Sequence, residues 1–182
     1  MTKPTQLPLP LPVKPALGRE DYFLSSSNAL AVSLIADWRN WPGRKLLLLG
    51  PTCSGKTHLA HVWAADSGAH IIAAADLHNA DVPTLASFDI CVEDVDQIAS
   101  DPAAQTALFH LHNLVLAQGR SLLLTAATPP ARWGLGLPDL VYECDYFLLF
   151  IVTQFSNSNI HNAHQPGAVY RVRAEGVSFG SC

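Results

Sequence analysis

The 182-residue sequence has no block of lysine or arginine and no closely spaced pair of cysteines. Its 11 Lys and Arg residues are outnumbered by 15 Asp and Glu residues, for a formal net charge of -4. Nucleic-acid-binding surfaces gather basic residues to displace phosphate counterions, so we expect no direct, specific DNA binding. The widely separated cysteines (Cys53, Cys91, Cys144 and Cys182) argue against a zinc ribbon or disulfide framework and are typical of a reducing cytoplasm.

Long apolar runs are also missing. The longest, YFLLFIV at Tyr146–Val152, is too short to span a bilayer, and prolines interrupt the N-terminal segment where a signal peptide would need a continuous apolar stretch. We therefore expect a cytoplasmic protein without a membrane partner. The hydrophobic fraction of 49% and the charged fraction of 14% suit a single globular domain with tails.

The sequence divides into three segments that differ in composition. Residues 1–16 are proline-rich and predict an extended leader, and residues 17–140 carry the patterns of a folded domain. Residues 141–182 form an atypical tail: no Asp, Glu, Lys or Arg occurs between Tyr146 and Tyr170. The tail can be read as a divergent end whose apolar run adds a fifth strand before irregular structure, as a change of reading frame, or as a sequence added to the chain. The abrupt loss of charge and helical pattern favours the second reading.

Within residues 17–140, short apolar runs bounded by turn residues alternate with helical patterns. Such runs are typical of buried parallel strands, and they lie at Lys45–Leu49, His70–Ala75, Phe88–Val92 and Ser121–Thr125. Helices are expected at Ser25–Trp38, at Lys56–Asp66 and from Pro102 to Gly119. This alternation predicts an α/β domain with a mainly parallel sheet covered on both faces.

The segment GPTCSGKT fits the phosphate-loop pattern G-x-x-x-x-G-K-[ST], with a strand before it and a helix after it. In such a loop, glycines let backbone N–H groups point at phosphate oxygens, and the following helix adds its positive end. The predicted nucleotide-binding residues are Gly50, Pro51, Thr52, Cys53, Ser54, Gly55, Lys56 and Thr57. Lys56 would reach the β- and γ-phosphates of ATP, and the Thr57 hydroxyl would bind Mg²⁺.

Acidic residues follow the third apolar run. Glu93 and Asp94 come where a parallel strand would deliver them beside the phosphates, so we expect them to hold Mg²⁺ with Thr57 and to orient the attacking water. Thr125 ends the fourth run and is placed to sense the γ-phosphate. The predicted catalytic residues are thus Glu93, Asp94 and Thr125.

Four stretches in order carry a family resemblance: REDYFLSSSNALA, GPTCSGKTHLAHVWA, VEDVD, and ALFHLHNLVLAQGRSLLLTAATPPARWGLGLPDL. Together they resemble the AAA+ module of the bacterial replication initiator DnaA, and more closely the shorter Hda-type regulators of DnaA, over about residues 6–140. The resemblance implies a P-loop AAA+ three-layer sandwich with adenine held near Tyr22, Phe23 and Leu24. It also implies bound ATP or ADP, and leaves room for a homo-oligomer.

The sequence departs from the family at three places. Glu93 stands where Asp is usual, and Ala126 and Ala127 stand where relatives place Ser-Asp or Gly-Asp. The segment LPDL is followed by VYEC instead of a Ser-Arg-Leu that would supply an arginine finger, and no helical lid is recognisable after it. Because an arginine finger contributes about a thousandfold or more to hydrolysis, we expect at most a weak ATPase.

The stretch QLPLPLP, Gln6–Pro12, is similar to the peptide with which Hda-type proteins bind the DNA polymerase sliding clamp. Prolines keep the segment extended before binding, Gln6 can hydrogen-bond, and Leu7, Leu9 and Leu11 can fill an apolar pocket. The resemblance thus implies a clamp-bound adapter that promotes ATP hydrolysis by DnaA and limits re-initiation of replication.

Two other functions stay open. An ATP-dependent helicase loader or remodelling ATPase would need a basic groove for single-stranded DNA, which the charge balance disfavours. A small P-loop kinase would need several arginines around the transferred phosphate, and only Arg120 and Arg132 lie between the phosphate loop and the tail. The kinase ranks last.

Overall fold

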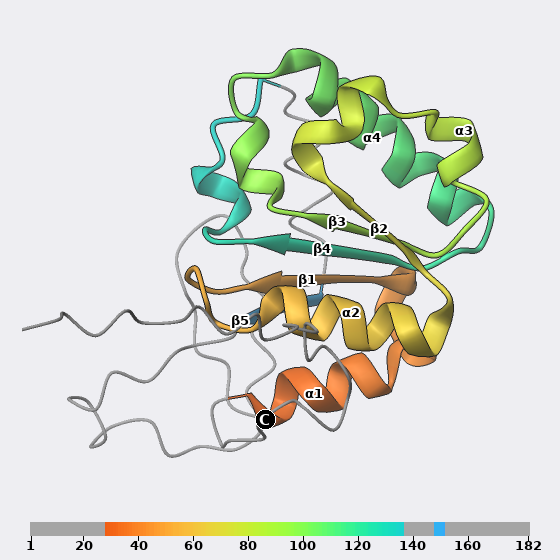
Figure 1. Ribbon diagram of the computed structural model, residues 1–182, viewed down its shortest axis with the longest axis vertical. Coiled ribbons are helices and arrows are strands. Elements are labelled where there is room, and N and C mark those ends of the chain that lie inside the picture. The colour runs from red at the N-terminus through yellow and green to blue at the C-terminus, as the bar shows by residue number, and fades with distance from the viewer. Residues whose placement is uncertain (1–27, 137–147, 152–182) are drawn as a thin grey trace, which may run out of the picture.

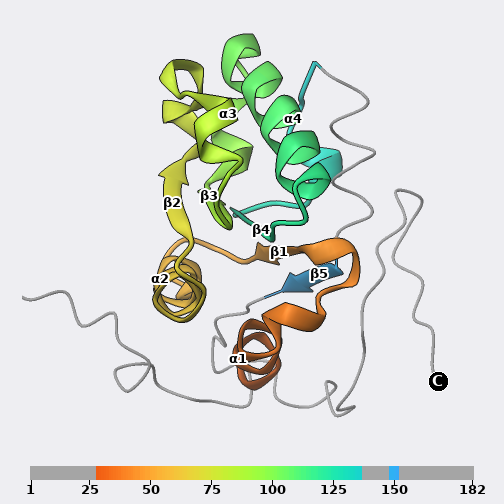
Figure 2. The same ribbon diagram turned by 90° about the vertical axis from the view of Figure 1, so that its right-hand side faces the viewer.

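The computed structural model describes residues 28–136 and 148–151 as a parallel sheet between two layers of helices. The five strands run in the order β2-β3-β4-β1-β5. Their bounds are β1 Lys45–Leu49, β2 His70–Ala73, β3 Ile90–Glu93, β4 Leu122–Ala126 and β5 Leu148–Ile151. Helices α1 (Ala29–Ala36) and α2 (Lys56–Ser67) cover one face, and α3 (Val82–Leu85) and α4 (Pro102–Ala117) cover the other (Figures 1 and 2).

Strand β1 lies inside the sheet and pairs in parallel with β4 on one side and β5 on the other. All five of its residues are buried, because successive side chains point to opposite faces and each face is covered. Leu47 and Leu49 pack in the core under α4, whereas Leu46 and Leu48 pack against the core that includes residues of α1 and α2. The continuous leucine run is therefore explained by its two-sided burial.

Residues with specific backbone roles fix the ends of α4. The side chain of Asp101 accepts a hydrogen bond from the Ala104 N–H at 3.0 Å, and Pro102 occupies the first turn, where its missing N–H costs nothing. Gly119 takes a left-handed φ of 67° just past the helix end. The helix thus stops two residues earlier than the predicted Gly119.

Two predicted elements need correction. The expected strand His70–Ala75 ends at Ala73, because Ala74 begins the 3-10 turn η4 (Ala74–Asn79), which carries Ala74 and Leu77 into the core. The predicted strand at Phe88–Val92 starts only at Ile90. Phe88 precedes it and is 39% exposed, with its ring stacked on His70 at a centroid distance of 4.1 Å.

The helix expected at Ser25–Trp38 is shorter among the described residues, and Leu30, which the apolar spacing of Leu30, Leu34, Ile35 and Trp38 predicts to be buried, lies on its exposed side. It ends at Ala36, and Trp38 belongs to the 3-10 turn η2 (Trp38–Asn40). Ala31 and Ile35 face the core, but Leu30 is 37% exposed. Apolar residues occupy nearly every position of ALAVSLIA, so the sequence alone could not select the buried side.

Three tryptophans join α1 to α2. Trp63 of α2 is fully buried, stacks on Trp41 at 5.3 Å between ring centroids, and meets Trp38 edge-on at 6.3 Å. The indole N–H groups of Trp38 and Trp41 donate to the Asp66 carboxylate and the Leu34 carbonyl, at 2.7 Å each. The Trp63 Nε1 atom is buried without a partner. Contact between the aromatic rings therefore stabilises this cluster, whereas its hydrogen bonds are made by the two outer rings, Trp38 and Trp41.

We expect Trp63→Ala to lower the free energy of unfolding by about 3–5 kcal/mol, because it removes a large buried ring and leaves a cavity. Trp63→Phe should cost clearly less, since it keeps a stacking ring and removes the unpaired N–H. Urea denaturation followed by circular dichroism measures both values. Equal losses for the two variants would contradict the role given to ring stacking.

Candidate nucleotide-binding site

The carboxyl ends of β1, β3 and β4 meet at one edge of the sheet and deliver the predicted site residues there. The phosphate-loop segment Gly50–Thr57 follows β1, Glu93 ends β3, and Ala126 ends β4. The parallel register places Leu49 beside Ala126 and Val92 beside Leu124. A backbone hydrogen bond from the Gly50 N–H to the Ala126 carbonyl, at 3.1 Å, ties the start of the loop to β4.

The loop has the backbone shape that its motif predicts. Cys53 and Gly55 have positive φ angles of 62° and 91°, which turn the chain back on itself before the helix. The Ser54 N–H donates to the Pro51 carbonyl at 3.2 Å, closing a tight turn. Helix α2 then begins at Lys56, so its positive end faces the loop. This is the arrangement that binds anions at helix N-termini.

Lys56 is held inside the loop. Its side chain is only 7% exposed, and its Nζ atom donates to the Gly50 carbonyl at 2.8 Å and to the Pro51 carbonyl at 3.1 Å. An ammonium group has three donors, so these two bonds fix the direction of the charge and leave one donor for a ligand. Thr57, the next residue, is exposed at the start of α2.

The acidic residues lie at the end of β3. Glu93 is half-buried, and its Oε1 atom is buried without a hydrogen-bond partner. Asp94 is exposed and takes the left-handed conformation, with φ 56° and ψ 48°, which is uncommon for a residue other than glycine. Burial, and then the charges of Glu93 and Asp94, raise the pKa of the Cys91 thiol well above its usual value, so this thiol stays protonated under the acidic edge.

Thr125 links the two strands and faces inward. It is 1% exposed, and its hydroxyl accepts a hydrogen bond from the Asp94 N–H at 3.1 Å. The hydroxyl thus holds the backbone of Asp94. Its predicted role as a sensor of the γ-phosphate stays a prediction.

Tyr22, Phe23 and Leu24, expected near the adenine, lie outside the described residues, as do the clamp-motif residues Gln6, Leu7, Leu9 and Leu11. The position of a helical lid would also fall beyond residue 136, where the structure describes only β5.

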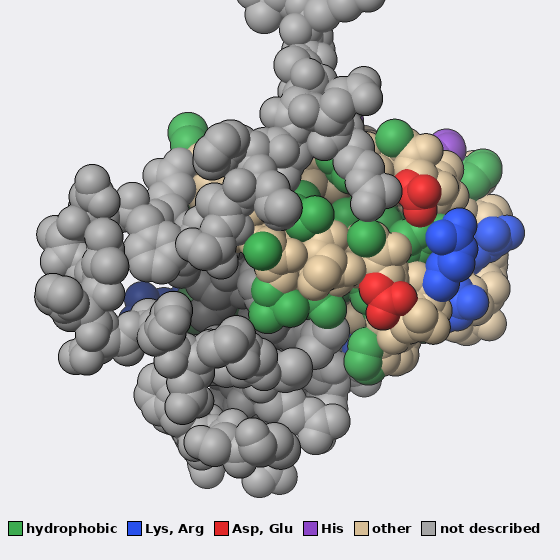
Figure 3. Space-filling view, turned by 90° about the horizontal axis from the view of Figure 1, so that it is seen from below, with side chains coloured by type: hydrophobic (Ala, Val, Ile, Leu, Met, Phe, Trp, Pro, Cys, Tyr) green, Lys and Arg blue, Asp and Glu red, His purple; other side chains and the backbone are tan. Residues whose placement is uncertain are grey.

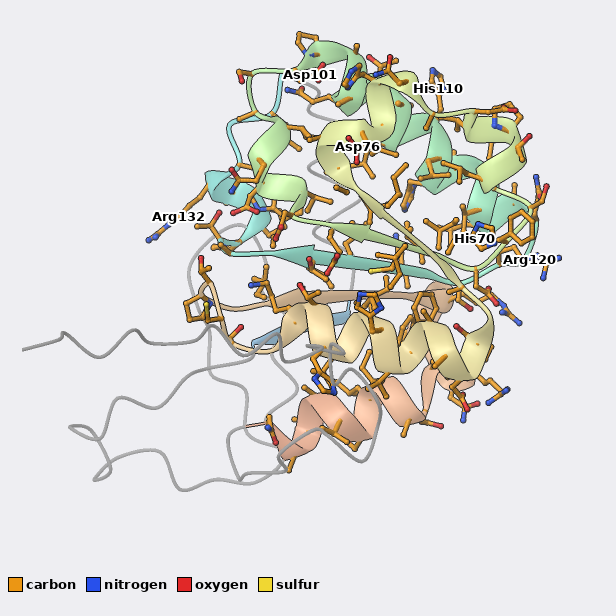
Figure 4. The ribbon with its side chains drawn as sticks, viewed as in Figure 1. His70, Asp76, Asp101, His110, Arg120 and Arg132 are labelled. Atoms are coloured by element: carbon orange, nitrogen blue, oxygen red, sulfur yellow. The ribbon has the colours of Figure 1, made fainter. Side chains whose placement is uncertain are left out.

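Most basic side chains of the described part lie away from this edge. Arg44 and Lys45 lie at the amino end of β1, and Figure 4 shows Arg120 and His70 at the same end of the sheet. Lys and Arg side chains also form a group at one end of the face in Figure 3. Arg132, on the turn η6 (Pro130–Arg132), lies at the carboxyl end and points outward in Figure 4. Arg120 is therefore remote from the phosphate loop of its own chain.

Sequence reasoning missed two contributors to this edge. The Ala126 carbonyl acts through a backbone atom, which has no side-chain signature. The other is Asp96, whose Oδ2 atom accepts from the Ala127 N–H at 3.2 Å and from the Thr128 hydroxyl at 3.4 Å. Its only signal was one more acidic residue in the stretch VEDVD.

The sheet order, the covering helices and the loop after β1 define a P-loop α/β fold of the AAA+ type. Solved structures of the replication initiator DnaA have a similar fold. The AMPPCP-bound protein from Aquifex aeolicus superposes with a TM-score of 0.68 at 16% identity, over 76% of this chain and 50% of that one. DnaA bound to AMPPCP and single-stranded DNA gives a TM-score of 0.70 at 17% identity, over 78% and 51%.

Domain III of DnaA from Thermotoga maritima gives a TM-score of 0.65 at 19% identity, over 78% of this chain and 69% of that one. The chain thus spans about half the length of the two longer DnaA structures. At these identities the likeness establishes the fold. No protein-family model matches the sequence. Within the described residues, every helix is too short or too polar to cross a membrane.

We expect Thr125→Val to lower the free energy of unfolding by about 1–3 kcal/mol, because valine has the same shape but leaves the Asp94 N–H without its acceptor. Thr125→Ser is the matched control: it keeps the hydroxyl and loses one methyl group, at a cost of about 0.8 kcal/mol. Urea titration compares the three proteins. A valine variant as stable as the parent would contradict the structural role of this hydrogen bond.

Proposed function

We propose that the chain is an AAA+ nucleotide-binding protein that holds ATP or ADP on Gly50–Thr57. The observation that carries the proposal is the state of Lys56: a nearly buried cation, fixed by two loop carbonyls, at the start of a helix. Burying an ammonium group is costly unless it is paired, and phosphate oxygens at the helix N-terminus supply the negative charge that such a group requires.

Mg²⁺ fits the same site. The unpartnered, buried Oε1 atom of Glu93 is a hard oxygen ligand of the kind that Mg²⁺ prefers. Thr57, at the end of the loop, and Asp94, directly after β3, are both exposed. They would supply the other protein ligands of the ion. Bound Mg²⁺ would neutralise phosphate charge, while the chain's own role is to orient these oxygens.

At the finer level, we propose a regulatory adapter that binds the sliding clamp through Gln6, Leu7, Leu9 and Leu11 and promotes ATP hydrolysis by DnaA. The support is the QLPLPLP motif, the order of the family-like stretches, and a fold shared with DnaA. The expected intrinsic ATPase is weak. The helicase-loader alternative differs in its partner: it would hydrolyse ATP in response to single-stranded DNA and would not bind the clamp.

Lys56→Ala should weaken binding of fluorescent mant-ADP by about tenfold or more, because it removes a charge-assisted contact to the phosphates. Arg132→Ala is the matched control, since it removes an exposed cation at the same end of the sheet. Circular dichroism checks that both variants fold. Parent-like affinity in the Lys56 variant would remove the phosphate loop from the proposed function.

The double change Gln6→Ala and Leu7→Ala should abolish co-purification with the sliding clamp, because it removes the hydrogen-bonding group and the first apolar anchor of the motif. Binding of mant-ADP should stay at the parent value. Lys3→Ala, three residues before Gln6, serves as a control that changes the leader but spares the motif. Failure of the parent protein to bind the clamp, together with DNA-stimulated ATPase activity, would favour the loader instead.

A further inference from the structure

Asp96 joins two loops at the edge of the sheet. It lies in the 3-10 turn η5 (Val95–Ile98), directly after the acidic end of β3, and is half-buried. Its Oδ2 atom accepts two hydrogen bonds from the loop after β4, from the Ala127 N–H and the Thr128 hydroxyl. One carboxylate oxygen thus connects the chain just past Asp94 to the chain just past Ala126.

The loop after β4 is in turn connected to the phosphate loop. The Ala126 carbonyl accepts from the Gly50 N–H, and the Thr125 hydroxyl accepts from the Asp94 N–H. The end of β4 therefore contacts both halves of the candidate site: the loop that would bind phosphates and the residues that would face Mg²⁺. A displacement of this segment would change the spacing between the two halves.

The remainder of this edge is firmly anchored from α4. The buried Gln105 side chain donates to the carbonyls of Ile98 and Ala99, at 3.0 and 2.9 Å, and accepts from the Gly136 N–H at 2.9 Å. The Trp133 indole donates to the Thr128 carbonyl at 2.6 Å. These contacts fix the far ends of both loops. Asp96 supplies a link between them, directly after the bond from Asp94 to Thr125.

The second oxygen of Asp96 makes no hydrogen bond. Its Oδ1 atom is buried without a hydrogen-bond partner, which is unfavourable for a carboxylate. An apolar side chain would avoid this cost, but it could not accept the hydrogen bonds from Ala127 and Thr128. The role of Asp96 at this edge is therefore that of an acceptor that links the two loops.

We propose that Asp96 is a positioning residue of the nucleotide site, holding the loop after β4 so that Glu93 and Asp94 keep their place relative to the phosphate loop. The inference rests on the proposed nucleotide binding and concerns its magnesium-dependent part. Thr57 would hold Mg²⁺ from the phosphate loop, and Glu93 and Asp94 would hold it from the end of β3, so the magnesium-dependent part of binding would require both halves at a fixed spacing. Binding of a nucleotide through Gly50–Thr57 alone does not require this spacing.

The test compares the full chain with its Asp96→Ala and Asp96→Asn variants, by titrating mant-ATP in excess Mg²⁺ and again in EDTA. Asp96→Ala should reduce affinity in Mg²⁺ by about tenfold, as expected for losing hydrogen bonds to a charged group. Its affinity in EDTA should match that of the parent. Asp96→Asn should stay within about threefold of the parent in Mg²⁺, because its amide oxygen can accept the same two hydrogen bonds.

Asp76→Asn is the matched control, since it removes one exposed acidic charge from η4. If Asp96→Ala does not fold, Thr128→Val removes one of the two hydrogen bonds and should give a smaller loss, again only in Mg²⁺. Three results would each overturn this inference and leave the proposed function standing: unchanged affinity of the Asp96→Ala variant, an equal loss of affinity with and without Mg²⁺, or an Asp96→Asn variant that binds as weakly as Asp96→Ala. Absence of mant-ATP binding by the parent would overturn the proposed function and this inference with it.

Discussion

The pairing of β1 with a strand on each side is the constraint from which the rest of this structure follows. A strand buried on both faces and hydrogen-bonded along both edges has no freedom to shift. The chain must leave it at Leu49, beside the end of β4, and turn into α2. The phosphate loop is therefore shaped by a rigid strand behind it and a rigid helix ahead of it, and its two positive-φ residues absorb the change of direction.

Basic and acidic residues are unevenly distributed along the sequence around this loop. Between Thr57 and Gly119 the sequence contains no lysine or arginine, although it contains the acidic residues at the end of β3. Lys56 is thus the cation placed directly at the start of α2, and it is tied to the loop carbonyls. Among the described residues, Lys56 and the N-terminus of α2 therefore give this loop a positive end of the kind that binds anions.

The sequence predicted the parts of this arrangement that depend on local patterns. The run KLLLL predicted a buried strand, which is confirmed, and G-x-x-x-x-G-K-T predicted a tight loop between a strand and a helix, which the structure also has. The end of β2 and the buried side of α1 could not be predicted in the same way. Alanines at 73–75 and apolar residues throughout α1 satisfy several local structures equally, and packing against Leu77 or Trp63 decides between them.

In the candidate site, too, local motifs could be predicted and long-range contacts could not. Lys56 and the acidic pair were visible as motif residues, whereas the bonds of Thr125 to Asp94 and of Asp96 to Ala127 join residues that are each 31 apart in sequence. No pattern within a loop contains that information. It arises from the neighbouring positions of β3 and β4 in the sheet.

The tryptophan cluster has a consequence for how the molecule can be observed. Trp63 lies seven residues after Lys56 on α2, about two helical turns or roughly 10 Å along the axis. Any tilt or shift of α2 at the phosphate loop is carried by the stiff helix to an indole that stacks on Trp41 and meets Trp38 edge-on. The chain thus contains its own optical reporter, because the fluorescence of this ring cluster depends on the position of the helix that begins at the phosphate loop.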